Sequence, residues 1–185
     1  MPQNSEPTGF GRDRWFGTIQ AGLRDTMIHE ATHQAAFNTG LHSRIGDNPH
    51  WVVEGLATVF EAPGIRQRNT TGKASRMSRI NRGRFVRFRN YMQHRRAAES
   101  LKSFIAGDTL YRRSKLDFYG QAWALSFYLL ETRSSRYAGY LKQIAARDPL
   151  KTYTSQERVA DFQSAFGDDL NSLETGFLRY MERLK

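Results

Sequence analysis

The chain has 185 residues, of which 39% are hydrophobic and none is cysteine, and its formal net charge is +10. This length and apolar content fit one domain with a buried core and exclude wholesale disorder. The lack of cysteine excludes disulfide scaffolds, thiolate zinc sites, iron–sulfur clusters and cysteine nucleophiles. Any metal would therefore have to bind His, Asp or Glu.

The sequence predicts neither a membrane span nor a signal peptide. No run of about 18 apolar residues occurs, and Met1 to Arg14 form a polar segment without an apolar stretch. The chain could still be an excised domain or could have lost a leader, so the compartment stays unknown.

The first two predicted elements are helices. One runs from about Leu23 to Phe37 and stops at residues 38–40, where Gly40 suits a left-handed end. The next begins at Asn48-Pro49, with Asn48 as cap, and ends after Glu61.

The third predicted element is a basic loop over residues 65–96. Between Arg66 and Arg96 there are eleven Lys or Arg and no acid, which leaves 17 basic against 18 acidic residues elsewhere. Gly, Ser, Asn and Thr interrupt any helical period in this segment. Phe85, Phe88 and Tyr91 alternate with arginines, as in some single-strand nucleic-acid binders, but a solvated face is commoner and nucleic acid is considered unlikely. A positive field could instead attract an anionic substrate or polymer.

The remaining elements are also predicted to be helical. Thr154 and Glu157 have the spacing of a capping box. Only two short stretches, Trp15–Ile19 and Phe85–Phe88, would pass as strands. The predicted fold class is therefore mainly α with little or no β-sheet. The expected C-terminal elements are Glu99–Ala106, Tyr119–Thr132, Arg136–Ala146, Ser155–Phe166 and Leu170–Leu184.

The segment that carries chemistry is His29-Glu30-Ala31-Thr32-His33, an HExxH pattern. Two His at i and i+4 on a helix share one face, so both rings can reach a single metal ion, and the Glu beside the first His is offset toward a metal-bound water. The alternative is a surface helix with two solvated His. The pattern favours zinc.

A hydrolytic zinc site needs a third protein ligand and one position left for water. In the second helix Glu54, Thr58 and Glu61 share a face, and Glu54 would complete a set of two His and one Glu. Glu61 could accept a hydrogen bond from the far nitrogen of a ligating His, so Glu61 and Thr58 are expected around the ligands. Small Gly55 and Ala57 would let this helix pack closely on the first. The alternative is a solvated face.

These segments resemble the zinc core of the gluzincin, or peptidase MA-like, metallopeptidases. HEATHQ and WVVEGLATVFE are most similar to an uncharacterised bacterial family of that clan, which has HEATHQxxFNTGLH followed by PxWxxEGLATxFE. They are more distantly similar to the HExxHxW and WxNEGxAxxxE segments of the aminopeptidase-N family. Phe37–His42 and Pro49–Glu61 match that pattern nearly without a gap. The resemblance implies a gluzincin-type helical core over about 22–132, C-terminal helices over 135–185 and one Zn²⁺ per chain.

The resemblance extends to a third segment, in which a Tyr opens a helix of the form YxKGxxLxxYL and stabilises the oxyanion. Tyr119 occupies that register in YGQAWALSFYL, although a core aromatic would be the commoner reading without the resemblance. Two features of the clan are missing. The chain before His29 is too short for the upstream β-sheet, and the Gly-rich exopeptidase motif is absent.

The expected function is that of a zinc-dependent metallopeptidase over one domain, residues 1–185. His29, His33 and Glu54 would bind Zn²⁺, Glu30 would act as general base on the metal-activated water, and Tyr119 would share the oxyanion. Two alternatives remain: a catalytically silent binding module on the same scaffold, and a basic-loop binder of nucleic acid or an anionic polymer. The substrate is expected to be a peptide or protein.

Overall fold

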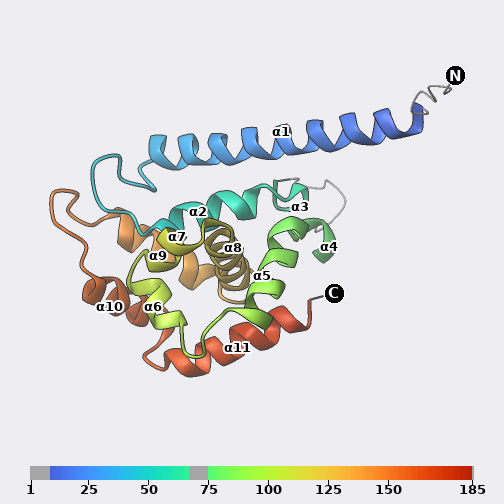
Figure 1. The fold of residues 1–185 in the computed structure, drawn as a ribbon. Helices are drawn as coiled ribbons and strands as arrows, with labels where there is room; N and C mark the ends of the chain where they lie inside the picture. Colours follow the sequence, from blue (N-terminus) through green and yellow to red (C-terminus); the bar gives the residue numbers. More distant parts are fainter. Residues whose placement is uncertain (1–8, 67–74, 185) are drawn as a thin grey trace, which may run out of the picture.

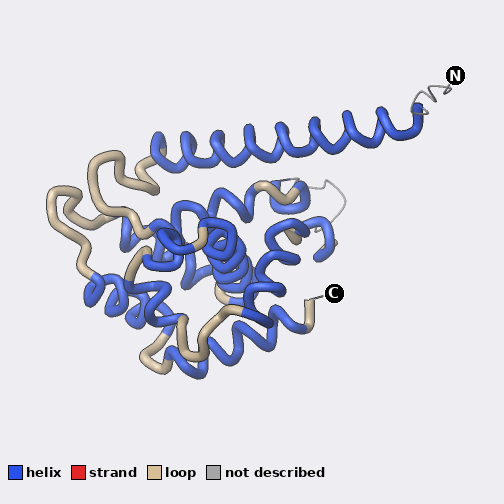
Figure 2. Tube along the Cα trace, in the orientation of Figure 1, coloured by secondary structure: helices blue, strands red, loops and turns tan. Residues whose placement is uncertain are grey.

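The structure, a computed structural model, describes residues 9–66 and 75–184, with side chains described from residue 22 onward. Every regular element in these ranges is a helix (Figure 2), so the predicted mainly α fold class is confirmed. The helices are α1 (Gly9–Asn38), α2 (His50–Phe60), α3 (Pro63–Arg66), α4 (Arg76–Arg79), α5 (Arg82–His94), α6 (Leu101–Ala106), α7 (Thr109–Arg113), α8 (Lys115–Thr132), α9 (Ser134–Ala145), α10 (Ser155–Phe166) and α11 (Leu170–Glu182).

The helix α8 forms the centre of the fold. Between Asp117 and Leu129 every side chain except that of Tyr119 is buried. Helices α2, α5, α7, α9 and α11 pack around α8 (Figure 1). A helix that is apolar on nearly all sides belongs in a core, and α8 fits that rule. Tyr119 is therefore the position at which this central helix reaches the surface of a cleft.

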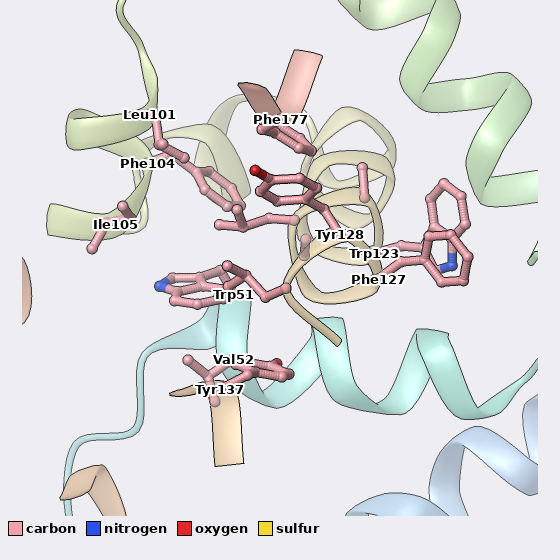
Figure 3. Packing of buried hydrophobic residues seen from close by; sticks show 14 of the residues in the cluster. Trp51, Val52, Leu101, Phe104, Ile105, Trp123, Phe127, Tyr128, Tyr137 and Phe177 are labelled. Carbon is pink, nitrogen blue, oxygen red and sulfur yellow. The ribbon is translucent and has the colours of Figure 1, made fainter. Parts of the chain in front are cut away.

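The core beside α8 is built largely from aromatic side chains (Figure 3). The ring of Trp51 on α2 stacks on Tyr140 of α9 at 5.9 Å and meets Phe162 of α10 edge-on, also at 5.9 Å. Phe177 of α11 packs against Tyr128 at 5.5 Å. These pairs join the C-terminal helices to α2 and α8, so the framework of the fold extends over both halves of the chain.

The close contact of α2 is with α8, where we had predicted one with α1. A Cβ atom at Gly55 would lie 2.2 Å from Ser126 Oγ and 2.7 Å from the Ala122 carbonyl oxygen, both on α8. No side chain fits in that space, so Gly55 sets how closely the two helices approach.

Helix α1 begins much earlier than the predicted Leu23, and it includes Trp15–Ile19, which we had allowed as a strand. No proline interrupts residues 9–38, so the helix that starts to pack near residue 23 can propagate backward. Its C-terminal end is as predicted, since Gly40 follows with φ of 74°. Figure 1 shows α1 lying across one side of the body and extending beyond it, and α2 is its main contact.

The basic segment is not the predicted loop where it is described, because it contains α3, α4 and α5; residues 67–74 lie outside the described part. The Asn81 side chain caps α5 by accepting a hydrogen bond from the Arg84 N–H at 3.2 Å. Phe85, Phe88 and Tyr91 recur every three residues and are all buried, which is a helical spacing. Phe85–Phe88 is therefore not a strand, and these rings are not free to stack on bases.

Other helix ends differ locally from the predicted ones. Helix α8 starts at Lys115, because Ser114 accepts a hydrogen bond from the Asp117 N–H, so Tyr119 lies in its second turn and does not open it. The Asn48 side chain binds the backbone of Ser43 and does not cap α2. The capping box of Thr154 and Glu157 is confirmed.

None of the helices in residues 9–66 and 75–184 has the length and hydrophobicity needed to cross a bilayer.

Candidate metal centre

The two His of the HExxH segment lie on the face of α1 that is turned toward α2. Their i, i+4 spacing places the rings one turn apart, and the two Nε2 atoms are 3.0 Å from each other. Both side chains are mostly buried, with exposed fractions of 13% for His29 and 16% for His33. The predicted convergence of the two rings is present.

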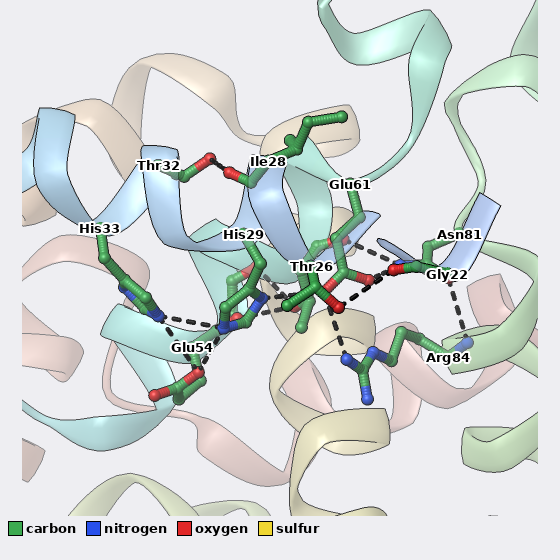
Figure 4. Close-up of polar contacts among 12 residues, drawn as sticks. Gly22, Thr26, Ile28, His29, Thr32, His33, Glu54, Glu61, Asn81 and Arg84 are labelled. Atoms are coloured by element: carbon green, nitrogen blue, oxygen red, sulfur yellow. Dashed lines mark hydrogen bonds and ion pairs between the residues drawn. The ribbon is translucent and has the colours of Figure 1, made fainter. Parts of the chain in front are cut away.

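Glu54 joins the pair from α2 (Figure 4). Its Oε2 atom lies 3.1 Å from His29 Nε2 and 3.5 Å from His33 Nε2. Tetrahedral zinc with ligands at about 2.0–2.1 Å would hold its ligand atoms roughly 3.3 Å apart. The three separations of 3.0, 3.1 and 3.5 Å bracket that value, so this donor set fits a zinc ion.

Glu61 holds His29 through the hydrogen bond that its position in the sequence predicted. His29 donates from Nδ1 to Glu61 Oε1 at 2.8 Å, which directs Nε2 toward Glu54 and His33. Glu61 also accepts hydrogen bonds from Asn81 Nδ2 at 2.5 Å and Arg84 Nη2 at 3.2 Å. The carboxylate is thus fixed from three directions.

Protonation of the metal-free centre follows from these contacts. Burial acts to lower the pKa of His29, but hydrogen bonds to Glu54 and Glu61 prevail and raise it to about 9. Burial acts to raise the pKa of Glu54, yet His29 and His33 lower it to about 2. Without a metal, His29 thus carries a proton on Nε2 at neutral pH, and an incoming cation replaces that proton.

A family comparison covers this region of the chain. The family described as "Protein of unknown function (DUF1570)" matches residues 24–151, which include His29, His33, Glu54 and Tyr119. The chain belongs to this family. No curated protein and no solved structure matches the sequence. The description of the DUF1570 family assigns no activity, so the resemblance to gluzincins enters below only as part of a proposal.

The predicted general base of this DUF1570 chain is next to His29 in the sequence, but it takes no part in the hydrogen bonds of the centre. Glu30 is exposed on α1, and no described residue is hydrogen-bonded to it. Each residue turns about 100° around a helix, so Glu30 flanks the face that carries His33. Catalytic contacts often form only when substrate is present, and an exposed carboxylate at this place can still reach a water beside the ligands.

Tyr119 lies within reach of the centre, on α8. Its ring centroid is 6.3 Å from that of His29. Burial, together with the negative charge of Glu54, raises the pKa of Tyr119 to about 12. The phenol therefore keeps its proton at neutral pH and stays a hydrogen-bond donor.

Thr58 lies beside Glu54, in the position around the centre that the sequence predicts. It is fully buried, and its hydroxyl donates to the carbonyl oxygens of Glu54 at 2.7 Å and Gly55 at 3.0 Å within its own helix. Its own carbonyl oxygen accepts a hydrogen bond from Asn81 Nδ2 at 3.1 Å. Thr58 thus contacts the backbone of Glu54 and the side chain of Asn81, and no side chain of the two His.

Asn81 and Arg84 belong to the candidate site but were not predicted from the sequence. Besides donating to Glu61, Arg84 places its guanidinium 4.9 Å from the centroid of the Tyr119 ring. The two residues follow Glu61 by 20 and 23 positions across a segment with no recognisable period. The one available signal was Asn81 itself, a residue preferred at helix N-caps, and it predicts a cap rather than a site.

The centre opens into a cavity of about 570 Å³ between α1, α5 and α8. This size is typical of a small-ligand site. Glu30 is not among its lining residues. The lining residues are Gly22, Asp25, Thr26, His29, Glu61, Asn81, Gly83, Arg84, Arg87, Leu116 and Tyr119.

Proposed function

We propose that this protein is a zinc-dependent hydrolase of the metallopeptidase type, with the gluzincin arrangement of ligands. The observation that carries the proposal is the convergence of His29 Nε2, His33 Nε2 and Glu54 Oε2 at 3.0–3.5 Å beside a cavity. Two nitrogens and one oxygen are ligands that zinc prefers, and three protein ligands leave a position open.

Each residue around the centre would have a distinct task. His29, His33 and Glu54 would hold Zn²⁺, which when bound polarises a carbonyl oxygen and lowers the pKa of a water molecule. Glu30 would accept a proton on its carboxylate and return it to the leaving amine. Tyr119 would donate its phenolic proton in a hydrogen bond to the oxygen on which negative charge develops.

Glu61 and its partners would keep the first ligand in place. By accepting a hydrogen bond from the Nδ1–H group of His29, Glu61 would fix the ring orientation and the tautomer that leaves Nε2 for a metal. Arg84 and Asn81 hold Glu61 in turn, and Arg84 also packs over Tyr119. One arginine therefore contacts both the group that positions a ligand and the proposed oxyanion donor.

Metal content is the first test. Protein purified without added metal or chelator should contain about one zinc per chain by elemental mass spectrometry, and His33→Ala should lose it. Absence of zinc together with no uptake on titration would contradict the proposal. The basic segment, residues 66–96, would then be the best place to look for a function.

Turnover is the second test, on a diverse peptide library. Glu30→Gln should keep the metal and lose roughly 10²- to 10⁴-fold in rate, because only the proton acceptor is removed. Zinc binding without chelator-sensitive cleavage of any peptide would instead support a catalytically silent binding module. Unchanged hydrolysis by Glu30→Gln would remove Glu30 from its assigned role.

A further inference from the structure

The cavity beside the metal centre has two walls of different charge. On α5, Arg84 and Arg87 are three residues apart, so both lie on one face of the helix and both line the cavity. On α1 the wall is formed by Gly22, Asp25 and Thr26. His29 and Tyr119 lie where the walls meet, so a group bound at the α5 wall is next to the reacting atoms.

Arg87 carries positive charge that its acidic partner does not fully offset. Its Nη2 atom is 3.0 Å from Asp117 Oδ1. Asp117 also receives two hydrogen bonds from Arg95, at 3.1 and 2.9 Å, so one carboxylate faces two guanidinium groups. The Arg87 side chain is 37% exposed, and beyond this ion pair no hydrogen bond from its guanidinium to a described residue is present. Its Nε atom is buried, so its terminal nitrogens are the donors that a ligand would meet.

Arg84 is anchored with donors to spare. It uses Nη2 for Glu61, and no further hydrogen bond from its guanidinium to a described residue is present. The neighbouring ion pair and the ring of Tyr119 hold the side chain in place before any ligand arrives. Preorganised guanidinium groups of this kind favour bidentate binding of carboxylates.

Asp25 is the acidic group that faces these arginines from α1. Its side chain is 46% exposed, and its nearest cation is Arg24 Nε at 3.9 Å. Solvent at such an exposed carboxylate screens its charge from the opposite wall. On this side of the cavity Arg84 pairs with Glu61 and Arg87 pairs with Asp117. Arg95, just beyond the end of α5, supplies a further positive charge to Asp117 and so leaves Arg87 less fully neutralised.

We propose that Arg84 and Arg87 form a carboxylate-binding subsite next to the metal centre, and that the preferred substrates are peptides with an acidic group near the scissile bond. This inference rests on the proposed function in taking the cavity as a substrate cleft. Among the described basic residues of the 66–96 segment, Arg84 and Arg87 are the two that line this cavity.

The test measures binding, so it does not depend on turnover. Zinc-loaded Glu30→Gln is titrated into fluorophore-labelled alanine hexapeptides with amidated ends, in which glutamate occupies each position in turn, beside a matched glutamine set. A third peptide, all alanine with a free C-terminal carboxylate, separates a terminal carboxylate from a side-chain one. We expect one acidic peptide to bind about tenfold more tightly than its neutral match.

The matched variants locate the effect. Arg87→Gln in the same background should remove the preference, and Asp117 would keep Arg95 as its partner, so folding should be preserved. Arg89→Gln removes the same charge from an exposed residue outside the cavity and should retain the preference. The inference would be overturned if glutamate at every position changed the affinity by less than about twofold. It would also be overturned if Arg87→Gln and Arg89→Gln had equal effects.

Cleavage assays on the wild-type protein with the same peptides separate the two proposals. Acid-selective binding without cleavage would leave the subsite standing and count against the hydrolase. Cleavage of acidic and neutral peptides at equal rates would support the hydrolase and overturn the subsite.

Discussion

Helices α1 and α8 flank the metal centre from opposite sides, and the rest of the fold supports them very differently. α8 has five helices packed around it, and nearly all of its side chains are buried. α1 packs mainly on α2 and exposes apolar residues such as Leu23 at 61% and Met27 at 73%. Two of the three proposed ligands therefore lie on the less supported helix, while Glu54 and Tyr119 belong to the packed framework. A cation at the centre would connect the two.

The largest predicted difference in the free energy of unfolding is between two Leu→Ala variants, one on α8 and one on α1. Leu125→Ala on α8 removes a fully buried side chain and should lower the free energy of unfolding by about 2–5 kcal/mol. Leu23→Ala on α1 removes the same atoms from an exposed site and should change it by less than about 0.5 kcal/mol. Urea denaturation followed by circular dichroism measures both. Equal losses would show that α1 is as firmly packed as α8.

A second prediction concerns the metal as a link between the helices. Zinc at about 100 times its dissociation constant should stabilise α1 against local opening by up to about 2.7 kcal/mol, because an open α1 loses two ligands. Hydrogen exchange should then slow for amides of residues 23–38 and change far less in α8. Chelator should reverse the effect, and His33→Ala should not show it. Uniform slowing across both helices would contradict this account.

The smallest predicted change in stability concerns Asp117 of α8, which is paired with Arg87 of α5 and with Arg95. The hydrogen bond from Arg95 holds the pKa of Asp117 below its usual value of 3.8, against the opposing effect of burial. A lowered folded-state pKa stabilises the protein fully above the unfolded value and loses that contribution as pH falls through the folded one. Asp117→Asn should therefore cost about 1 kcal/mol at pH 7 and progressively less below pH 4.

Exposed Asp168 supplies the control for this pH dependence. Asp168→Asn removes the same charge where no described cation pairs with it, so its effect should be close to zero at every pH. Urea denaturation at pH 7, 5 and 3 measures both variants. A loss for Asp117→Asn that stays constant down to pH 3 would exclude an electrostatic origin.

Much of the centre was predictable because its signals are local. The i, i+4 spacing of His29 and His33 predicts two rings on one helix face. Glu54 lies on a short helix and Glu61 directly follows it, before the Pro63-Gly64 pair that marks its end. Gly40 was expected in the left-handed region and has φ of 74°. In each case neighbouring residues decide the geometry.

The parts that the sequence did not predict depend on contacts between distant segments. In α5 the apolar residues Phe85, Phe88 and Tyr91 are separated by arginines, so the sequence pattern predicts a loop. The packing of these rings on α8 is what makes the segment a helix. Arg84 reaches Glu61 only because α5 folds back beside the end of α2. No fixed spacing connects such residues, and only the tertiary fold brings them together.

The tight crossing at Gly55 has a mechanical consequence. Position 55 has no room for a side chain against Ala122 and Ser126, so the distance between α2 and α8 is fixed most tightly at that crossing. Glu54 is the adjacent residue, so a rocking motion of α2 would displace it very little relative to Tyr119. Helix α1 packs mainly on α2, so the distances from its two His to Glu54 depend on how those two helices pack against each other.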